Sequence, residues 1–516
     1  MGDARLQLFQ QFSANQWDGF RKGVEKEGLR VDQDGFIAQT PHPRSLGSTL
    51  THPQITTDYS EALLELITPV YDSTAKVMTA LQDVHAFVQE ELGNEVLWAA
   101  SMPCRLAGDA SIPIAEYGSS NIGRLKHVYR QGLAVRYGRI MQSIAGAHYN
   151  VSLPDSFWQQ WQQALGDESS LQDFKSQQYF WLIRNFRRRS WLLMYLFGAS
   201  PALDASFVAG VSHGLKPWSA DTFYGEHATS LRMGDLGYHN NAQSALDICF
   251  NDLKGFTDTL GKAIHTPWPA YEELGMTRDG EFIQINTNIL QIENEYYSAM
   301  RPKRTTLRGE KPIQALTARG VEYVEVRCLD LDPFSPVGVS AAQLDFLDLF
   351  LLDCLLADSP VIADCECSRL DGNYKRVVAE GRQPDLTVQL ADQALPLADA
   401  ANRLLDRTEV LAEQLDQWCG GQTYRQAVAA QRAKVMNTAD VPSAKVLAAM
   451  RASGKGHVDW SLDISRNHQQ HLRQRGLTPE RRDSYQAMAA ASWQEQDALE
   501  RSDTQPFEEF LTQYSA

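Results

Sequence analysis

The sequence predicts an α+β fold, in which a mixed body of strands and helices over about residues 1–340 precedes a helical region over about residues 341–516. Segments that alternate polar and apolar residues occur in the first part. Segments with apolar residues at three-to-four spacing occur throughout and dominate after Ala341. No long Pro/Gly/Ser-rich linker separates the two parts, so we expect one elaborated domain over residues 1–516, with the helices packed on the body.

Five segments of the body are expected to be β-strands. Each alternates polar and apolar residues or is rich in β-branched and aromatic residues. They are Gly23–Val31, Leu63–Thr68, Ala147–Leu153, Phe282–Ile292 and Val321–Leu329.

The helices are expected from their apolar periodicity, and no convincing strand is expected after residue 341. In the body, the predicted helices are Ser73–Leu92, Leu171–Tyr195 and Ser244–Ala263. In the C-terminal region, the predicted amphipathic helices are Ala341–Ala357, Leu397–Trp418, Thr423–Lys434, Ala444–Ala452 and Pro479–Arg501.

The composition is that of a soluble globular protein with an acidic balance. Of the 516 residues, 43% are hydrophobic and 22% are charged, and the formal net charge is -16. Affinity for nucleic acid comes mainly from Lys and Arg on phosphates, so an acidic chain is a poor candidate for binding it. Any anionic ligand must be held by local Arg or Lys side chains or through metals.

The cysteines and the apolar stretches predict a cytoplasmic protein that does not enter a membrane. The seven cysteines are scattered and none forms a Cys-x-x-Cys, which fits a reducing compartment. The first residues lack the apolar core of a signal peptide. The longest apolar stretches, Trp191–Leu203 and Phe346–Ala357, are well short of the ~20 residues that a membrane span needs.

Glu25 and Glu27 lie two residues apart in a predicted strand, so both carboxylates point to the same face. The opposite face carries Val24, Lys26 and Gly28. Two like charges at this separation repel unless a cation lies between them, and paired oxygen ligands suit Mg²⁺ or Mn²⁺. The pair therefore predicts a metal site and, with it, phosphate chemistry.

Glu65 interrupts the apolar run Leu63–Thr68, where a charge is hard to bury without a partner. Two interpretations of this segment stay open. Residues 60–64 could begin a helix that Asp58 caps, or Leu63–Thr68 could be a strand. In either case Glu65 is the most conspicuous carboxylate between Asp58 and Leu66.

Two further strands carry polar residues on one face. His148 and Asn150 share a face of Ala147–Leu153, and Glu325 and Arg327 share a face of Val321–Leu329. A single His on a strand is more often a satisfied polar residue than a ligand, and Glu325 with Arg327 could be a plain ion pair. The neighbouring Asn150 shifts the interpretation of His148 towards a polar cavity, and the loop after residue 329 is a place where a site could open.

Basic residues form islands at Arg130, at Arg232 and at Arg301–Arg304. The guanidinium fork of Arg matches a carboxylate or phosphate with two hydrogen bonds, so these islands are candidate anion sites. A solvated surface or a helix C-cap is the alternative for each island. The segment Gly210-Val211-Ser212-His213-Gly214 fits a serine hydrolase motif, but no strand is expected before it and no helix after it, so we do not expect a nucleophile there.

These motifs stand in an order that resembles the bacterial single-function glutamate–cysteine ligases. The resemblance runs from about residue 20 to the C-terminus and is densest up to about residue 336. The motifs that carry it are Glu25-Lys-Glu-Gly-Leu-Arg30, residues 55–65, Ser101-Met-Pro-Cys104, residues 117–124, Tyr129-Arg130, Gly146-Ala-His-Tyr-Asn150, residues 228–232, Asp235-Leu-Gly-Tyr238, Gln291-Ile-Glu-Asn-Glu295, Arg301-Pro-Lys-Arg304 and residues 321–327.

The resemblance implies a glutamine-synthetase-like fold, in which a curved antiparallel sheet forms a funnel for ATP, divalent metals and two amino acids. By this resemblance the Mg²⁺ (or Mn²⁺) ligands are Glu25, Glu27, Asp58, Glu65, His148 and Glu325. The residues around the amino-acid substrates are Tyr129, Arg130, Asn150, Arg232, Tyr238, Tyr297 and Arg327. Tyr238 and Tyr297 would form the cysteine pocket. Arg130, Arg232 and Arg327 would offset charge in the reaction, and Arg301, Lys303 and Arg304 would lie beside the nucleotide.

The implied activity is the ATP-dependent joining of cysteine to the γ-carboxylate of glutamate through γ-glutamyl phosphate. The resemblance also leads us to expect inhibition by glutathione, the end product of that pathway, and a monomer. Two alternatives stay open, which are a ligase of the same fold with another amine acceptor and a non-catalytic sensor of nucleotide or glutamate. All six metal positions of the family are filled here, which favours the enzyme.

Overall fold

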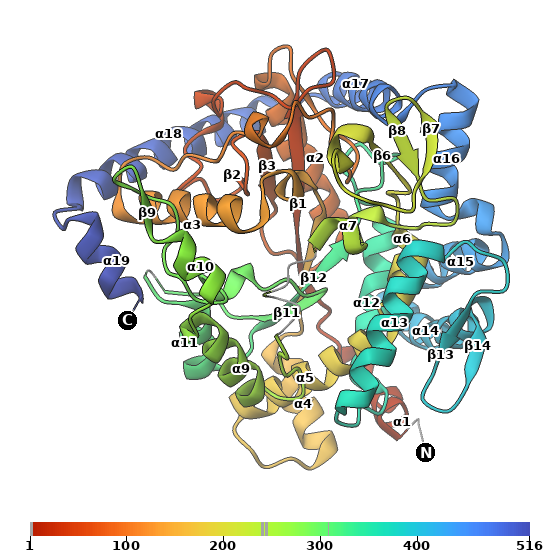
Figure 1. Cartoon of the computed structure of the whole chain (residues 1–516). Coiled ribbons are helices and arrows are strands. Elements are labelled where there is room, and N and C mark those ends of the chain that lie inside the picture. The colour runs from red at the N-terminus through yellow and green to blue at the C-terminus, as the bar shows by residue number, and fades with distance from the viewer. Residues whose placement is uncertain (1–3, 239–241, 243–245, 308, 516) are drawn as a thin grey trace.

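A seven-stranded antiparallel sheet lies at the centre of the computed structural model, which describes all residues except 1–3, 239–241, 243–245, 308 and 516 (Figure 1). The strands run in the order β11-β12-β5-β1-β3-β2, and the short β4 pairs with β1. The long strand β1 therefore has neighbours on both sides. The strands are β1 (Arg21–Val31), β2 (Ile55–Thr57), β3 (Leu63–Ile67), β4 (Val96–Leu97), β5 (Ala147–Ser152), β11 (Met300–Lys303) and β12 (Tyr323–Leu329).

One face of this sheet is apolar and is covered by helices. Val24, Tyr149 and Val326 lie side by side on β1, β5 and β12, and all three are buried on this face. The covering helices are α2 (Thr74–Glu91), α5 (Leu171–Arg189) and α12 (Ala341–Leu356). Helix α2 contacts β1 and β3, α5 contacts β11, and α12 packs against both helices. These helices leave the opposite, polar face of the sheet available for a functional site.

A buried ion pair joins α12 to the apolar face of the sheet. Lys22 on β1 pairs with Asp348 on α12, and their side chains are 2% and 0% exposed. Asp348 also accepts hydrogen bonds from the hydroxyls of Tyr149, at 2.5 Å, and Tyr424, at 3.4 Å. Burial raises the pKa of Asp348, and the Lys22 ammonium opposes that rise. The pair explains how a lysine is accommodated beneath the sheet.

We expect Asp348→Ala to lower the free energy of unfolding by about 3–5 kcal/mol, because it leaves the Lys22 ammonium buried without its counter-charge. Urea unfolding followed by circular dichroism measures the loss. The double variant Lys22→Met/Asp348→Leu should recover much of it, since an apolar pair removes both buried charges. A single variant as stable as the wild type would show that the ion pair does not hold α12 in place.

The structure confirms the five helices that were predicted after residue 341 and adds to them. The predicted helices correspond to α12, α14 (Leu397–Cys419), α15 (Thr423–Met436), α16 (Pro442–Ser453) and α18 (Pro479–Ser502). Helix α12 is buried on all sides rather than amphipathic. The elements that were not predicted there are α13 (Asp364–Glu380), α17 (His457–Arg475), α19 (Phe507–Ser515) and a hairpin of β13 (Thr387–Gln389) and β14 (Ala394–Pro396). The hairpin shows that the expectation of no strand after residue 341 is wrong, because strands of three residues are too short to show an alternating pattern.

The C-terminal helices wrap around the body. Helix α18 packs on α2, and α19 packs on α3 (Asn121–Tyr137), so the end of the chain lies beside the first third of the sequence (Figure 1). Helix α17 contacts α2 and β4. The helical region is therefore packed closely on the α+β body.

Three predictions for the body need correction. The segment Phe282–Ile292 is not a strand, because only Glu281–Phe282 (β10) pairs, with Thr277–Arg278 (β9). Side-chain amides there take the place of a ladder, as when Gln284 donates to the carbonyls of Tyr271 and Gly275. The predicted helix Leu171–Tyr195 divides into α5 and α6 (Trp191–Phe197) at Ser190, and the helix predicted over Ser244–Ala263 begins only at Leu253, as α9 (Leu253–His265). Residues 244 and 245 of that prediction lie outside the described residues.

The remaining elements surround the sheet. A small second sheet has the order β6-β8-β7. The segment around Ser212 lies in a loop between the 3-10 turn Ala205–Val208 and β7, so it lacks the strand and helix of a nucleophile elbow. None of the helices that the structure describes is long and apolar enough to cross a bilayer. The remaining elements, which surround the central sheet, are α1 (Ala4–Gln10), α4 (Asp155–Leu165), β6 (Ala202–Asp204), β7 (Lys216–Ser219), β8 (Thr222–Tyr224), α7 (Asp235–Tyr238), α10 (Pro269–Leu274) and α11 (Pro312–Arg319).

Candidate active site

The polar face of the sheet collects the carboxylates that the sequence singled out. Glu25 on β1 lies directly opposite His148 on β5, and Glu27 lies directly opposite Glu65 on β3. Glu325 on β12 lies opposite Asn150 on β5. Directly opposed residues of antiparallel strands share a face, so these side chains converge from four neighbouring strands.

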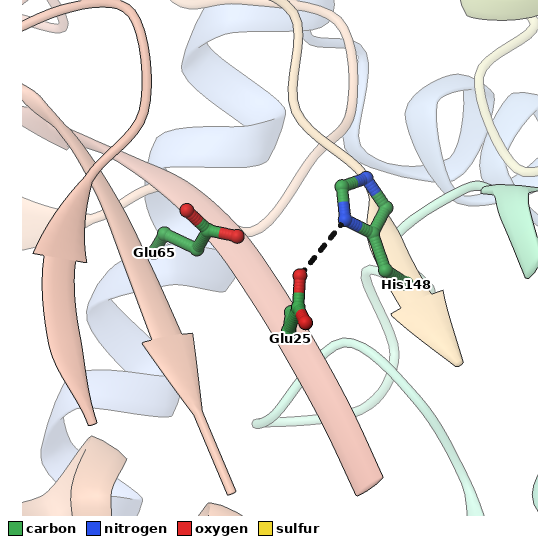
Figure 2. Close-up of side chains that lie close together, drawn as sticks. All are labelled: Glu25, Glu65 and His148. Carbon is green, nitrogen blue, oxygen red and sulfur yellow. Dashed lines mark hydrogen bonds and ion pairs between the residues drawn. The ribbon is translucent and has the colours of Figure 1, made fainter. Parts of the chain in front are cut away.

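His148 lies at the centre of this group. Its Nδ1 atom is 3.4 Å from Glu25 Oε2 and 3.6 Å from Glu325 Oε1, and its Nε2 atom is 3.5 Å from Glu27 Oε1. Glu65 completes the cluster, because one ligand atom from each of Glu25, Glu65 and His148 lies within 4.8 Å of the others (Figure 2). The side chain of His148 is only 4% exposed, so the cluster is buried rather than part of an exposed surface. The acidic cluster of Glu25, Glu27, Glu65, His148 and Glu325 is called the floor of the site below.

The carboxylates of this floor have widely different pKa values. Burial raises the pKa of Glu65 well above its usual range, and the charges of Glu25, Asp58 and Glu27 add to the rise. Burial alone would also raise the pKa of Glu25, but the hydrogen bond and the charge of His148, together with the charge of Lys303, lower it to about 2. The carboxylates therefore oppose one another's ionisation, and a divalent cation between them would relieve that repulsion.

Glu27 and Glu325 form two sides of the floor. Burial raises the pKa of Glu27, and the nearby His148 opposes that rise. Burial would raise the pKa of Glu325 too, but Lys303, with Arg327 and His148, lowers it below its usual range. Glu325 is therefore held as a carboxylate beside the basic side of the site.

Asp58 and Glu65 come from the strand pair β2–β3. The structure decides between the two interpretations of this segment, since Leu63–Ile67 is a strand and Asp58 precedes it without capping a helix. The Asp58 carboxylate is close enough to raise the pKa values of both Glu27 and Glu65. The six predicted metal positions therefore lie on one side of the sheet.

The three predicted arginines approach this floor from different elements. Arg327 on β12 donates from Nη1 to Glu325 Oε1 at 2.9 Å. Arg232, in the 3-10 turn Leu231–Met233, is 2% exposed and donates from Nη2 to the carbonyl of Arg327 at 3.2 Å. Arg130 on α3 donates from Nε to the carbonyl of Asp58 and stacks 4.6 Å from the ring centre of Tyr117. Both Arg232 and Arg327 lower the pKa of Glu27, which places their charge beside the floor.

Asn150 contributes a polar group that points into the same region. Its Nδ2 atom donates to Glu25 Oε1 at 2.7 Å. Its Oδ1 atom is buried and accepts no hydrogen bond from any residue that the structure describes. A buried acceptor without a donor is costly, so this atom suits a ligand donor such as an ammonium group.

The predicted nucleotide cations border a cavity of about 340 Å³ at the β11 edge of the sheet. Arg301 faces Glu325 across the ladder, and Lys303 Nζ is 3.5 Å from Glu325 Oε2. Arg304 lies at the rim, with its Nε atom 3.7 Å from the exposed Glu322. The cavity is lined by these three cations and by apolar and aromatic residues that include Phe256, Leu260, Tyr296, Ile313, Leu316 and Tyr323.

Three tyrosines were predicted around the amino-acid substrates. Burial raises the pKa of Tyr129 on α3, so its hydroxyl stays protonated. The Tyr297 hydroxyl donates to Met233 Sδ at 3.2 Å, which brings it close to Arg232. Tyr238 ends the short helix α7, and its side chain lies outside the described residues.

Two groups that hold Arg232 were not predicted as parts of the site. Asp330 Oδ1 lies 3.8 Å from Arg232 Nη1, and Asp330 also accepts hydrogen bonds from the hydroxyls of Ser200, at 2.6 Å, and Ser230, at 2.9 Å. Gly146 packs against the guanidinium so closely that a β-carbon there would lie 2.1 Å from Nη2. The sequence offered one signal for each: Asp330 follows the Glu325–Arg327 strand, and Gly146 begins the motif that contains His148.

Known proteins resemble this chain over nearly all of its length. A family model described as glutamate-cysteine ligase matches residues 6–377. A glutamate–cysteine ligase from Hahella chejuensis (strain KCTC 2396) is 56% identical over 96% of this chain and 95% of its own length. The same enzyme from Azotobacter vinelandii (strain DJ / ATCC BAA-1303) is 54% identical over 96% of this chain and 94% of its own length.

Solved structures show the same architecture. The crystal structure of a glutamate–cysteine ligase from Francisella tularensis, in complex with AMP, superposes with a TM-score of 0.90 at 37% identity and covers 96% of this chain and 97% of that chain. A bifunctional glutathione synthetase from Pasteurella multocida superposes with a TM-score of 0.72 at 23% identity over 90% of this chain and 54% of that chain, which indicates a shared fold. The predicted fold class, an α+β fold with a curved antiparallel sheet and a helical C-terminal region, is confirmed.

Proposed function

The chain belongs to the glutamate–cysteine ligase family, and we propose that it joins cysteine to the γ-carboxylate of glutamate on the polar face of its central sheet, with ATP as co-substrate. Joining these two amino acids is the first step of glutathione biosynthesis. The observation that carries the proposal is the convergence of Glu25, Glu65 and His148 beside the cavity that Lys303 and Arg301 border. The relatives named above support cysteine as the acceptor rather than another amine, and they favour an enzyme over a sensor.

The floor of the site is the metal site in this proposal. Its donors are carboxylate oxygens and one imidazole, which suit Mg²⁺ or Mn²⁺, and the crowded charges around Glu65 fit a bound cation. When bound, Mg²⁺ would neutralise the phosphate charges and polarise the transferring phosphoryl group. The proposed ligands are Glu25, Glu27, Asp58, Glu65, His148 and Glu325.

The nucleotide is proposed to occupy the cavity at the β11 edge. Its apolar wall, which includes Leu260, Ile313 and Leu316, suits a base, and the cations Arg301, Lys303 and Arg304 suit phosphates. Lys303 also pairs with Glu325, so the phosphate end of this cavity meets the metal floor. The AMP complex of the similar Francisella enzyme supports a nucleotide in this fold.

The amino acids are proposed to lie between α3 and β12. The buried Oδ1 atom of Asn150 is placed to accept a hydrogen bond from a substrate ammonium group. Arg130, Arg232 and Arg327 would bind carboxylates and offset the charge that develops at the reacting atoms. Tyr129, Tyr238 and Tyr297 would complete the walls, with the last two beside the cysteine side chain.

The reaction proposed here has two steps. An oxygen of the glutamate γ-carboxylate attacks the γ-phosphorus of ATP, and ADP leaves, which gives γ-glutamyl phosphate. The cysteine amine then attacks the acyl carbon, the C–O bond to phosphate breaks, and the amine loses a proton. Alignment and charge neutralisation are the main tasks of the protein, because a loose phosphoryl transition state needs little covalent help.

Activity is tested by mixing the purified protein with ATP, Mg²⁺, glutamate and cysteine and following phosphate release and product mass together. We expect cysteine-dependent phosphate release with a product of the mass of γ-glutamylcysteine. Equal phosphate release with glycine or another amine in place of cysteine would overturn cysteine as the acceptor. No release with any amine would leave the sensor as the better interpretation.

We expect Arg327→Lys to lower kcat/KM for glutamate or ATP by about 10- to 100-fold, since a hydrogen bond to a charged group contributes ~1.5–3 kcal/mol. Lysine keeps the charge but lacks the planar fork that holds an anion with two bonds. Steady-state kinetics for each substrate measure the effect. Arg482→Lys is the matched control, because Arg482 forms a fork with Glu90 in a partly exposed ion pair between α18 and α2, away from the site. Unchanged kinetics would show that Arg327 only pairs with Glu325.

The remaining features of the proposal concern the whole chain. We propose a single catalytic domain over residues 1–516 that acts as a monomer in the cytoplasm and is inhibited by glutathione. All seven cysteines are free thiols, which is typical of a reducing compartment. Light scattering after size exclusion and activity assays with added glutathione test these points, and a stable dimer or activity that glutathione leaves unchanged would contradict them.

A further inference from the structure

A fully buried ion pair connects α3 with the segment that precedes β11. The side chains of Arg136 on α3 and of Glu295 are both 0% exposed, and Nη1 of Arg136 lies 3.2 Å from Oε1 of Glu295. Arg136 also stacks on Tyr271, with its Cζ atom 4.1 Å from the ring centre. Glu295 belongs to the Gln291–Glu295 motif, to which the activity described above assigns no role.

Arg136 uses its whole guanidinium to hold this segment. Its Nε and Nη2 atoms donate to Gln284 Oε1 at 3.0 and 2.8 Å, and Nη2 also donates to the carbonyl of Asn286 at 2.6 Å. Nη1 donates to the carbonyl of Asn288 at 3.1 Å. The stretch from Gln284 to Ile292 is irregular and leads into a 3-10 turn at Glu293–Glu295, so these bonds to α3 replace the ladder that a strand would provide.

The Glu295 carboxylate forms one hydrogen bond within the segment and another with α3. Its Oε2 atom accepts a hydrogen bond from the backbone N–H of Gln291 at 2.5 Å, and its Oε1 atom accepts one from the Tyr137 hydroxyl. Gln291 in turn donates from Nε2 to the carbonyl of Tyr129 at 3.1 Å. Gly132 permits this approach, since a β-carbon there would lie 2.0 Å from Gln291 Oε1.

The two sides of this connection carry residues proposed for the same pocket. Helix α3 carries Tyr129 and Arg130, and the segment that Glu295 holds continues directly into Tyr297. Arg301 depends less on the connection, because the ladder between β11 and β12 also holds it. A displacement of the segment relative to α3 would therefore widen the pocket proposed for the amino acids, here called the acceptor pocket because cysteine would bind there. The nucleotide cavity at the β11 edge would be affected less.

We infer that the Arg136–Glu295 pair is a positioning clamp that sets the spacing between Tyr129 and Tyr297 and so aligns the acceptor amine with the activated glutamate. This inference rests on the proposed function. A buried ion pair contributes little net stability compared with apolar residues of the same volume, so stability alone gives no reason for it. Its many directional bonds instead specify one geometry.

The clamp is tested with Glu295→Asp, which keeps the charge but shortens the side chain by one methylene, about 1.5 Å. Because a displacement of this size can cost up to about 100-fold in rate, we expect the KM for cysteine to rise by at least about tenfold. The KM for ATP should stay near the wild-type value. The ratio of phosphate released to γ-glutamylcysteine formed should rise above one, because an acyl phosphate that the amine does not capture is hydrolysed.

Two further variants make the result decisive. Glu90→Asp is the matched control, because Glu90 forms a two-bond ion pair with Arg482 between α2 and α18, away from the site. Tyr137→Phe removes one hydrogen bond to Glu295 and keeps the ion pair, so it should shift the same parameters by less, even if Glu295→Asp folds poorly. A purely structural role would reduce the active fraction and leave the KM for cysteine and the product ratio unchanged.

The outcomes separate the clamp from the function on which it rests. A wild-type protein that forms no γ-glutamylcysteine would overturn the proposed function and the clamp with it. A wild-type protein that couples phosphate to product one to one, together with Glu295→Asp and Tyr137→Phe variants that fold and do the same at an unchanged KM for cysteine, would overturn the clamp alone.

Discussion

Glu25→Gln is expected to lower kcat by at least about 10²–10³-fold while the protein stays folded, a loss typical of one electrostatic group at a reacting centre. The carboxylate accepts a hydrogen bond from Asn150 Nδ2 at 2.7 Å and lies 3.4 Å from His148 Nδ1. Glutamine keeps the shape and one acceptor oxygen but removes the charge that a divalent cation would need. Turnover should therefore fall far more than stability.

Three measurements distinguish this result from misfolding. They are kcat at saturating Mg²⁺, binding of Mn²⁺ by titration, and thermal unfolding. Glu413→Gln makes the same chemical change at an exposed position on α14 and should leave all three unchanged. Near-normal kcat of Glu25→Gln at saturating Mg²⁺ would remove Glu25 from the metal site.

Gly146→Ala is expected to lower kcat/KM by about 10²-fold, the cost that a displacement of about 1 Å can bring at a reacting centre. A β-carbon at residue 146 would lie 2.1 Å from Nη2 and 2.5 Å from Cζ of Arg232. The guanidinium is the far end of a flexible side chain, so it can move aside without unfolding the protein. Arg232 would then leave its bonds to the carbonyls of Arg327 and Leu329.

The backbone of Gly146 would keep its own contacts in this variant. Its N–H donates to Glu27 Oε2 at 2.6 Å, and its carbonyl accepts from the Glu27 N–H at 3.0 Å. The effect should therefore resemble that of Arg232→Lys rather than that of a metal-ligand variant. Gly372→Ala is the control, because nothing lies within 4 Å of the β-carbon that it adds on α13. Wild-type kinetics for Gly146→Ala would show that Arg232 does not act from the position seen here.

The residues of the polar face could be predicted because strand periodicity is a local property. Glu25 and Glu27 share a face, as do His148 and Asn150, whatever the rest of the fold does. Glu65 was conspicuous for a different local reason, since a charge inside an apolar run needs a partner. The ordered motifs then carried the resemblance, and the similarity to known ligases confirms the family.

The sequence prediction failed where the pattern of polar and apolar residues suggests one structure and the side-chain contacts stabilise another. Phe282–Ile292 alternates like a strand, yet the side-chain amides of Gln284 and Gln291 bond to nearby and distant backbone groups and keep the segment irregular. Helix α12 has the apolar residues of an amphipathic helix but is buried on every side. In both cases the outcome depends on contacts that the alternation of residues within the segment does not encode, such as the bond from Gln291 to the carbonyl of Tyr129.

By itself, the sequence determined the fold class, the family and which residue types face one another along a strand, because these depend on the backbone period and on ordered motifs. Only the tertiary structure decided that Glu27 lies opposite Glu65 and Glu25 opposite His148. It also decided that Asp348 neutralises Lys22 and that Gly146 makes room for Arg232. The physical reason is that register, burial and the shifted pKa values come from contacts between distant segments, where desolvation and packing set the energies.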